Sequence, residues 1–355
     1  MQLKTLQTQD LSNKIVLIRT DFNVPLSDGA VSDDFRIISS LPTIQFCLDH
    51  QVAKIVLISH LGRPDGRPDA ELSLRPVADR LKTLLPDTHI EFVPATFGDA
   101  VKSAVLNSPA KSIILLENLR FDPREEQNSV DFAQDIVTST GADLFVQDGF
   151  AVVHRAHAST AAITKLLPSV AGLLLKNEID NLSSVKNHPE HPLLVLIGGS
   201  KVADKQPLID NFLPIADQIF IGGKIAADGF TSDSPKITVA HDFFMDELGQ
   251  KLDIGPESTI QLLESLKTAK SVIWNGVFGK TEDPTFTKSS IAITEFLGKS
   301  SGIHTIICGG DTVGFIRELQ KQQPDLHFDL LSTGGGASLE FLSGLELPGI
   351  SALLR

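Results

Sequence analysis

The sequence is poor in cysteine, contains no long apolar run and has a deficit of positive charge. Cys47 and Cys308 are the only cysteines in 355 residues, so no disulfide framework is available and the chain suits a reducing cytosol. No apolar run approaches the ~20 residues that a membrane span requires, and residues 1–14 have no apolar signal-peptide core. We therefore expect a cytoplasmic protein that does not bind membranes.

The deficit of positive charge limits the possible partners. The formal net charge is −13, which argues against nucleic acid or an anionic membrane as a general partner. A small anionic ligand would need a local basic patch. A 42% hydrophobic content over 355 residues fits a soluble globular protein of about two domains.

Two nucleotide-binding fingerprints are also missing. No G-x-G-x-x-G occurs, which weakens a dinucleotide-binding interpretation. The segments 279–281 and 298–300 resemble the end of a phosphate-binding P-loop, but Trp274 and Ile293 stand where its first glycine is required.

Short apolar runs alternate with segments of helical spacing along the whole chain. The strand-like runs are 14–19, 54–59, 89–93, 112–117, 143–147, 193–198, 218–222, 236–240, 271–275, 304–309 and 327–332. Near-continuous apolar strands indicate burial on both faces and hence parallel sheets. Helical spacing is typified by Ile37, Leu41, Ile44 and Leu48. The pattern predicts an α/β fold with two doubly wound, Rossmann-like domains.

The division between the domains is expected near residues 170–192. Residues 170–187 read as one amphipathic helix, which the prolines in 188–192 end. We predict an N-terminal domain over 1–169, a joining helix over 170–187 and a C-terminal domain over 188–345. The apolar tail 346–355 is expected to dock, on the N-terminal domain.

In the first half, polar residues follow the predicted strands. Ligands of open α/β sheets bind beyond the carboxyl ends of the strands. The residues found there are Asp21, Asn23, Arg36, His60, Arg63, Asn118, Arg120 and Arg155. Arginine forks match phosphate and carboxylate oxygens. Each arginine alone could be a surface charge or an ion-pair member, but four at successive strand ends predict an anion site. His154 and His157 fit turn or core positions better than catalysis.

In the second half, glycines occupy the same positions. Gly198 and Gly199 precede Lys201 and Lys205, which share a helix face. This segment alone could equally be an ordinary strand-to-helix turn with two solvated lysines. The other glycine turns are Gly222-Gly223, Asn275-Gly276, Gly309-Gly310 before Asp311-Thr312, and Gly334-Gly335-Gly336. Together they predict a nucleotide site at helix N-termini, with Asp311 a candidate Mg²⁺ ligand.

The motifs in their order resemble those of phosphoglycerate kinase. They are TDFNVP (20–25), SHLGRP (59–64), LLENLRF (115–121), HRAHAS (154–159), GGSKVADK (198–205), GGDT (309–312) and STGGGASLE (332–340). The resemblance covers nearly the whole chain. It implies two domains around a hinge, with 3-phosphoglycerate or 1,3-bisphosphoglycerate bound by the first and MgADP or MgATP by the second.

The resemblance also implies roles for the matching residues. The substrate positions are Asp21, Asn23, Arg36, His60, Arg63, Arg120 and Arg155. Arg36 and Lys201 would stabilise the transferring phosphoryl group, with Gly334 and Gly335 as the closing loop. The nucleotide positions are Gly199, Lys201, Lys205, Gly222, Gly223, Leu252, Asn275, Glu282, Gly309, Gly310, Asp311 and Thr312, with Asp311 engaging the metal nucleotide.

The chain departs from the family pattern around the adenine position. Val277 replaces a usual proline, Lys224 replaces a common third glycine, and the span from Gly229 to Asp253 is shorter than usual. The phosphate-handling residues are unaffected.

Two other functions share parts of this pattern. A nicotinamide dehydrogenase would share the α/β alternation but lacks its fingerprint and has no use for the arginines. A catalytically inactive scaffold derived from the kinase would keep the fold, yet every expected charged residue is present. We expect an active phosphotransferase and, by analogy with the family, a monomer.

Overall fold

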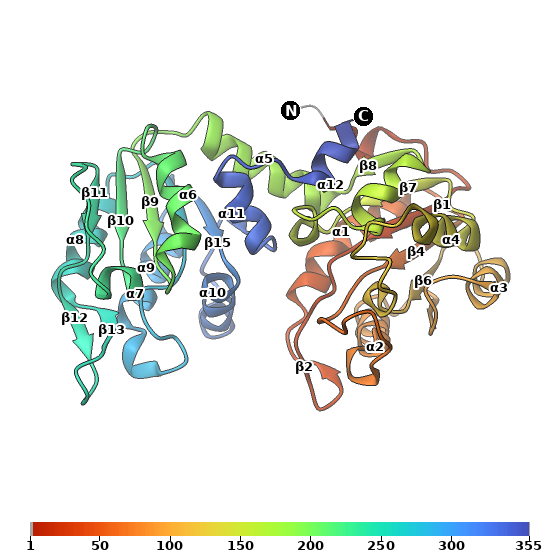
Figure 1. Ribbon diagram of the computed structural model, residues 1–355, viewed down its shortest axis with the longest axis horizontal. Helices are drawn as coiled ribbons and strands as arrows, with labels where there is room; N and C mark the ends of the chain where they lie inside the picture. Colours follow the sequence, from red (N-terminus) through yellow and green to blue (C-terminus); the bar gives the residue numbers. More distant parts are fainter. Residues whose placement is uncertain (1–2, 355) are drawn as a thin grey trace. The chain divides into compact units, whose positions relative to one another are not determined.

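The computed structural model describes residues 3–354. It divides into two compact units, unit 1 with Met1–Asn177 and Glu346–Arg355, and unit 2 with Glu178–Leu345 (Figure 1). Helix α5 (Leu173–Asn187) contains the boundary between them. Both units are built on six-stranded parallel sheets, as the α/β prediction required.

Unit 1 has the strand order β5-β6-β4-β1-β7-β8. These strands are β1 (Ile15–Arg19), β4 (Lys54–Ile58), β5 (Ile90–Val93), β6 (Ser112–Leu116), β7 (Leu144–Gln147) and β8 (Ser169–Ala171). A short hairpin of β2 (Leu26–Ser27) and β3 (Ala30–Val31) follows β1. The helices are α1 (Phe35–Asp49), α2 (Arg75–Leu84), α3 (Asp99–Asn107), α4 (Val130–Thr140) and α12 (Pro348–Ser351).

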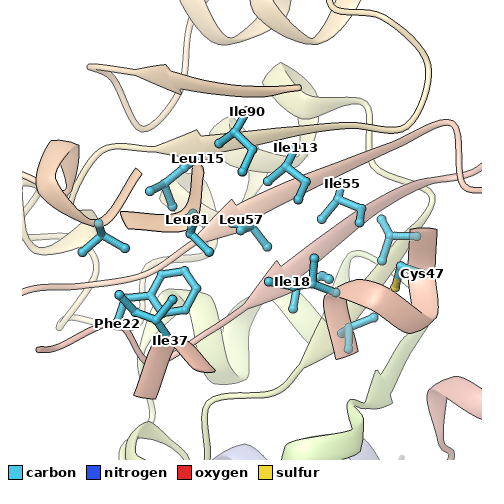
Figure 2. Packing of buried hydrophobic residues seen from close by; sticks show 14 of the residues in the cluster. Ile18, Phe22, Ile37, Cys47, Ile55, Leu57, Leu81, Ile90, Ile113 and Leu115 are labelled. Carbon is cyan, nitrogen blue, oxygen red and sulfur yellow. The ribbon is translucent and has the colours of Figure 1, made fainter. Parts of the chain in front are cut away.

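Alternating side chains of the unit 1 strands feed two separate cores. Val16 and Ile18 of β1 belong to one core, into which α1 and α2 pack, whereas Leu17 belongs to the other, with α3 and α4. Figure 2 shows the first core, where Ile18, Ile55 and Leu57 lie among helix side chains. Both faces of the sheet are therefore dry, which explains the near-continuous apolar runs.

Unit 2 repeats this architecture with the order β11-β10-β9-β14-β15-β16. Its strands are β9 (Leu193–Ile197), β10 (Gln218–Ile221), β11 (Ile237–Val239), β14 (Ser271–Asn275), β15 (His304–Cys308) and β16 (Leu330–Leu331), with a separate hairpin of β12 (Phe243–Met245) and β13 (Lys251–Ile254). Its helices are α6 (Val202–Phe212), α7 (Gly223–Ala227), α8 (Pro256–Leu266), α9 (Lys288–Lys299), α10 (Gly310–Gln322) and α11 (Gly336–Leu342).

Short 3₁₀ and π turns complete the described chain. They are η1 (Leu6–Thr8), η2 (Ala70–Leu72), η3 (Leu119–Phe121), η4 (Phe150–Val152), η5 (Ala158–Ala162), η6 (Ile163–Lys165), η7 (Pro284–Phe286) and η8 (Ala352–Leu354). Within residues 3–354, no helix combines the length and apolarity needed to cross a bilayer.

Two sequence predictions need correction. The segment 170–187 is not one helix, because residues through Ala171 form strand β8 and α5 begins at Leu173. The run 327–332 forms a strand only at Leu330–Leu331. The boundary between the compact units lies at Asn177/Glu178, inside α5. The tail from Glu346 groups with unit 1, where the Gly349 N–H donates to the Val153 carbonyl at 2.8 Å.

Candidate active site

Neighbouring parallel strands bring the polar residues of unit 1 together at the carboxyl ends of the strands. Arg19, the last residue of β1, stands in register with Ile58 of β4 and with Gln147 of β7. The chain segments that follow these strands therefore leave the sheet side by side. Residues that are far apart in sequence thus meet because the strands end together.

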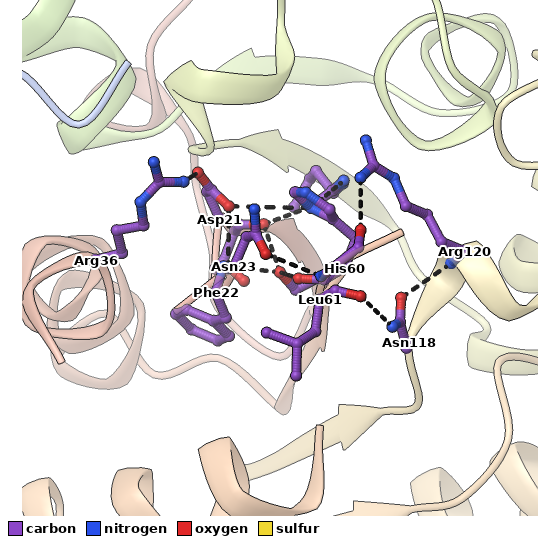
Figure 3. A network of polar contacts seen from close by, with 12 residues as sticks. Asp21, Phe22, Asn23, Arg36, His60, Leu61, Asn118 and Arg120 are labelled. Carbon is purple, nitrogen blue, oxygen red and sulfur yellow. Dashed lines mark hydrogen bonds and ion pairs between the residues drawn. The ribbon is translucent and has the colours of Figure 1, made fainter. Parts of the chain in front are cut away.

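Hydrogen bonds hold the loop after β4 in place. The Asn23 side-chain oxygen accepts from the Gly62 N–H at 2.9 Å, and Arg120 donates to the Gly62 carbonyl at 2.8 Å. Asn118 donates to the Leu61 carbonyl at 2.7 Å. Figure 3 shows this network joining the ends of three strands. The loop that carries His60 and Arg63 is therefore fixed by its neighbours.

Arg36 approaches the same region from the first turn of α1. It forms an ion pair with Asp21, whose side chain is 3% exposed. The Asn23 N–H donates to the other Asp21 oxygen at 3.1 Å. Asp21 thus holds Arg36 at the sheet edge without a substrate.

Three of the predicted arginines line one small cavity. It has a volume of about 210 Å³ and its charged lining residues are Arg63, Arg120, Arg155, Asp65, Asp122 and Glu126. Arg63 and Arg155 are exposed, whereas Arg120 is buried and pairs with Glu126 at 3.1 Å. Burial lowers the pKa of the Arg120 guanidinium, and the Glu126 carboxylate is the main opposing influence. A cavity of this size with three guanidinium groups suits a phosphate group.

The two buried histidines are held neutral. Burial, reinforced by Arg19 and Arg120, lowers the pKa of His60 well below its usual range. The same causes lower the pKa of His157 to about 4. Neither ring adds a positive charge to the site at neutral pH. His157 is buried, with its Nδ1 3.9 Å from the buried Glu125 carboxylate.

Close backbone contacts shape the site of unit 2. A side chain at Gly198 would come within 2.4 Å of the Gly276 carbonyl, and Gly199 has φ +92°. The turns after β9 and β14 therefore touch through their backbones, which only glycine permits. The Thr312 hydroxyl also contacts these turns, accepting a hydrogen bond from the Gly276 N–H at 2.9 Å.

These turns enclose a cavity of about 390 Å³. The predicted nucleotide residues in its lining are Gly199, Lys201, Lys205, Asn275, Gly309, Gly310, Asp311, Thr312 and Gly335. Lys205 donates to the Asn275 side-chain oxygen, and burial lowers the pKa of Lys205. Lys201 is exposed at the N-cap of α6, and Asp311 is exposed in the first turn of α10.

The glycine loop before α11 is anchored by a buried carboxylate. Glu178, fully buried on α5, accepts from the Thr333 N–H at 2.6 Å and from the Ser332 hydroxyl at 2.7 Å. Ser332 in turn accepts from the Gly334 N–H at 3.1 Å. Glu178 thus fixes the start of the loop, while Gly335, with φ +52°, is the N-cap of α11. Nothing in the local sequence around Glu178 signals this role.

Five predicted residues lie outside the lining of this cavity: Gly222, Gly223, Leu252, Glu282 and Gly334. Gly222 and Gly223 are buried, and a side chain at Gly222 would come within 2.4 Å of the Phe278 ring. Leu252 is half-buried and Glu282 is exposed. The cavity therefore brings together the predicted lysines, Asp311, Thr312 and the glycine turns around them, but not these five residues.

Sequence reasoning missed several residues that line the two cavities. In unit 2 these include Ser200 and Asp204, which lie within the GGSKVADK motif itself. In unit 1 they include Glu126, which lies six residues beyond Arg120. Asp204 could have been found from the sequence, because it is an acidic residue between Lys201 and Lys205 at the start of α6.

A family model for phosphoglycerate kinase matches residues 6–237 and 227–345. The chain belongs to the phosphoglycerate kinase family. The two matches overlap at 227–237, which places a break in the family pattern between α7 and β11.

Relatives in the phosphoglycerate kinase family match the chain along its whole length. The phosphoglycerate kinase of Pseudothermotoga lettingae is 38% identical over 400 residues, covering 99% of each chain. That of Coprothermobacter proteolyticus is 38% identical over 398 residues, covering 100% of this chain and 99% of its own. Both alignments are longer than the 355 residues of this chain, so it is shorter than these relatives.

Solved phosphoglycerate kinase structures agree with the fold. The Pyrococcus horikoshii OT3 structure has a TM-score of 0.88 at 25% identity, covering 99% of this chain and 98% of its own. The Coxiella burnetii structure has a TM-score of 0.80 at 29% identity, covering 99% of both chains. The phosphoglycerate kinase fold is thus retained despite the shorter chain.

Proposed function

We propose that the chain catalyses reversible phosphoryl transfer between 1,3-bisphosphoglycerate and MgADP, giving 3-phosphoglycerate and MgATP. The observation that carries this proposal is that unit 1 contains an arginine-lined cavity and unit 2 contains a cavity lined by glycines and lysines. Membership of the family supports both substrates.

Unit 1 is proposed to bind the phosphoglycerate. Arg63, Arg120 and Arg155 would hold its phosphate by bidentate hydrogen bonds, since three guanidinium groups share one cavity. Asp21, Asn23 and His60 would hold the remainder of the substrate. Arg36, already held by Asp21, would stabilise the transferring phosphoryl group.

Unit 2 is proposed to bind the nucleotide phosphates. The N-termini of α6, α10 and α11 open at the same cavity, and free N–H groups at a helix start attract anions. Lys201 and Lys205 would neutralise phosphate charge. The Gly334–Gly335 loop would close over the transferring group. Gly222, Gly223, Leu252 and Glu282 would contact the nucleoside.

Magnesium is proposed to arrive with the nucleotide. Asp311 fits a hard cation because its carboxylate is exposed on the cavity wall, and Asp204 lines the same cavity. Among residues 3–354, no cluster of three or more potential ligands is present. This donor set suits a cation that takes its other ligands from phosphate and water. The metal would neutralise charge on the phosphate oxygens.

The proposed reaction needs no general base. The attacking oxygen of ADP or of the 3-phosphoglycerate carboxylate is already ionised, so catalysis consists of positioning and charge neutralisation. Cationic side chains and backbone N–H groups without a proton-transfer triad fit this requirement. Water must also be excluded, because an acyl phosphate hydrolyses readily.

A coupled assay of ATP formation from 1,3-bisphosphoglycerate and MgADP tests the proposal. We expect turnover that depends on all components. An inactive scaffold would bind MgADP without forming ATP, and a nicotinamide dehydrogenase would respond only to its own cofactor. We further propose a cytoplasmic monomer, in keeping with a charge of −13 and two buried, unpaired cysteines.

A further inference from the structure

Arg19 contacts the His60 ring and is not among the residues predicted to touch a substrate. It is the last residue of β1 and is fully buried. Its Nε donates to the Ser159 hydroxyl at 2.8 Å, and Ser159 in turn donates to the buried Glu125. This bridge holds the guanidinium in place. A second guanidinium nitrogen lies 3.3 Å from Nδ1 of His60.

The contact with Arg19 determines which ring nitrogen of His60 carries the proton. A guanidinium can only donate hydrogen bonds, so Nδ1 must accept with its lone pair. The competing partner of Nδ1 is Asp21, but its oxygen is 3.9 Å away, beyond hydrogen-bonding distance. The Asp21 carboxylate is also engaged by Arg36 and by the Asn23 N–H. The proton of a neutral ring therefore belongs on Nε2.

The surroundings also oppose a second proton on the ring. The charged and titratable groups facing His60 come from five segments: Arg19 on β1, Asp21 after it, Arg36 on α1, Arg120 on η3 and His157 before η5. Three of these are permanent cations, and the His60 side chain is only 5% exposed. Burial and like charges both disfavour the imidazolium. Among residues 3–354, no protein hydrogen bond reaches Nε2 of His60, which leaves its N–H for a ligand.

We propose that Arg19 is a positioning residue that holds His60 as a neutral imidazole whose Nε2–H is donated to the substrate anion. The inference rests on the proposed role of His60 in phosphoglycerate binding. A neutral donor binds an anion equally well at pH 6 and pH 8, whereas an ordinary histidine would lose its positive charge across that interval. The site then takes its positive charge from arginines alone.

The direct test is ¹⁵N NMR of the histidine side chains in the full-length enzyme. The His60 signals are assigned by their loss in His60→Gln. We expect the pattern of a neutral ring with its proton on Nε2, unchanged between about pH 5.5 and 8. Titration of His60 near its ordinary pKa of about 6.5, or a proton on Nδ1, would overturn the inference.

Arg19 variants test its part in this arrangement. In Arg19→Met, Asp21 is the remaining polar group facing Nδ1, so we expect an Nδ1–H signal to appear. Arg19→Lys keeps a donor and should preserve the wild-type pattern. An unchanged His60 spectrum in Arg19→Met would contradict the proposal. If that variant does not fold, the wild-type spectrum and the His60 pair below decide the question.

Two amide replacements of His60 form a matched pair. The Gln amide nitrogen reaches the position of Nε2, whereas the shorter Asn amide mimics Nδ1. We expect KM for 3-phosphoglycerate to change less than about threefold in His60→Gln. It should rise about 10- to 100-fold in His60→Asn, the value of one hydrogen bond to a charged group. Equal effects of both variants on KM would overturn the inference. The NMR result needs no turnover, so absence of ATP formation would count against the proposed function alone.

Discussion

At the scale of single residues, Arg36 and Lys201 are expected to contribute most to catalysis. Arg36 is held by Asp21 at the sheet edge of unit 1, and Lys201 is exposed in the wall of the unit 2 cavity. Both are proposed to neutralise charge that develops on the transferring group. Arg36→Ala or Lys201→Ala should lower kcat by about 10²–10³-fold. Steady-state kinetics should show smaller changes in KM, and a near-normal kcat in either variant would contradict the mechanism.

Glu126 is expected to weaken anion binding in unit 1. Its carboxylate lines the arginine cavity and pairs with Arg120 at 3.1 Å, although it is 51% exposed. A substrate phosphate must therefore displace or tolerate this negative charge. Because exposed ion pairs are worth about 0.2–1 kcal/mol, Glu126→Gln should lower KM for 3-phosphoglycerate by up to about fivefold.

The Glu126 prediction has a matched control in unit 2. Glu264 of α8 also forms an exposed ion pair, with the C-cap residue Lys267 at 2.6 Å. Glu264→Gln should leave KM for 3-phosphoglycerate unchanged. Inhibition by sulfate should strengthen in the Glu126 variant only. An unchanged or higher KM in Glu126→Gln would show that the carboxylate does not compete with the substrate.

At the scale of elements, Asp148 caps the helix that contains the unit boundary. It is fully buried at the end of β7, and its Oδ1 accepts from the Leu174 N–H at 3.0 Å and from the Thr43 hydroxyl at 2.8 Å. Burial raises the pKa of Asp148 to about 7. Its other oxygen has no hydrogen-bond partner among the described residues. Ionisation of this carboxyl group is therefore expected to lower the stability of unit 1.

The raised pKa of Asp148 predicts how stability depends on pH. Between about pH 4 and 7 the folded chain holds a proton at Asp148 that the unfolded chain has released. This residue therefore favours folding below pH 4, and its contribution is lost as the pH rises towards 7. The loss is on the order of 2–4 kcal/mol. Asp148→Asn should flatten the pH dependence of the urea midpoint of unit 1.

The control for Asp148 is the exposed Asp87. Asp87→Asn should leave the pH dependence of unfolding as it is in the wild type. A slope between pH 4 and 7 that survives in Asp148→Asn would assign it to other groups. If Asp148→Asn instead lowers the free energy of unfolding by a similar amount at every pH, the amide cannot replace the carboxyl group as the cap of α5.

The span from Gly229 to Asp253, which the family resemblance marks as shorter than usual, is expected to relax the choice of base. At the start of this span, only residues 228–236 connect α7 to β11, and the two family-model matches overlap at 227–237. Less apolar protein is available to cover a base, at about 25 cal/mol per Å² of burial lost. GDP or IDP should replace ADP with a loss of kcat/KM of about tenfold or less, equivalent to ~1.4 kcal/mol. A thousandfold discrimination would show that the base site is complete.

At the scale of the whole molecule, the two sites belong to separate compact units. Each unit has its own sheet, and each cavity is lined by residues of one unit. Binding of one ligand alone should therefore be insensitive to substitutions in the other unit, because substitutions at sites that share no residues act additively.

Calorimetry on the full chain tests this independence. Arg63→Ala should weaken 3-phosphoglycerate binding and change the MgADP Kd by less than about twofold. Lys205→Ala should weaken MgADP binding about 10- to 100-fold and spare 3-phosphoglycerate. A large effect of Arg63→Ala on MgADP affinity would show that the sites are coupled even in binary complexes.

The sequence by itself determined the class of fold and most of the strands. Both followed from apolar runs, since burial on two faces requires them. The direction that a helix faces was harder to predict. In α8, Ile260 is 60% exposed, whereas Leu262 and Leu266 are buried, although all three residues are apolar. Periodicity in a short helix fits more than one face, and only packing against neighbouring elements selects one.

The motifs also located the arginines and the glycine turns, because positive charge and backbone flexibility are properties of these residue types. Three features depended on tertiary structure. Arg19 reaches His60 across 41 residues, Glu178 reaches Thr333 across 155, and Asp148 caps α5 from 26 residues away. Each is a buried charged group whose partner lies on a distant segment. Burial makes such a contact decisive for protonation and position, and no local pattern records which segments the fold will bring together.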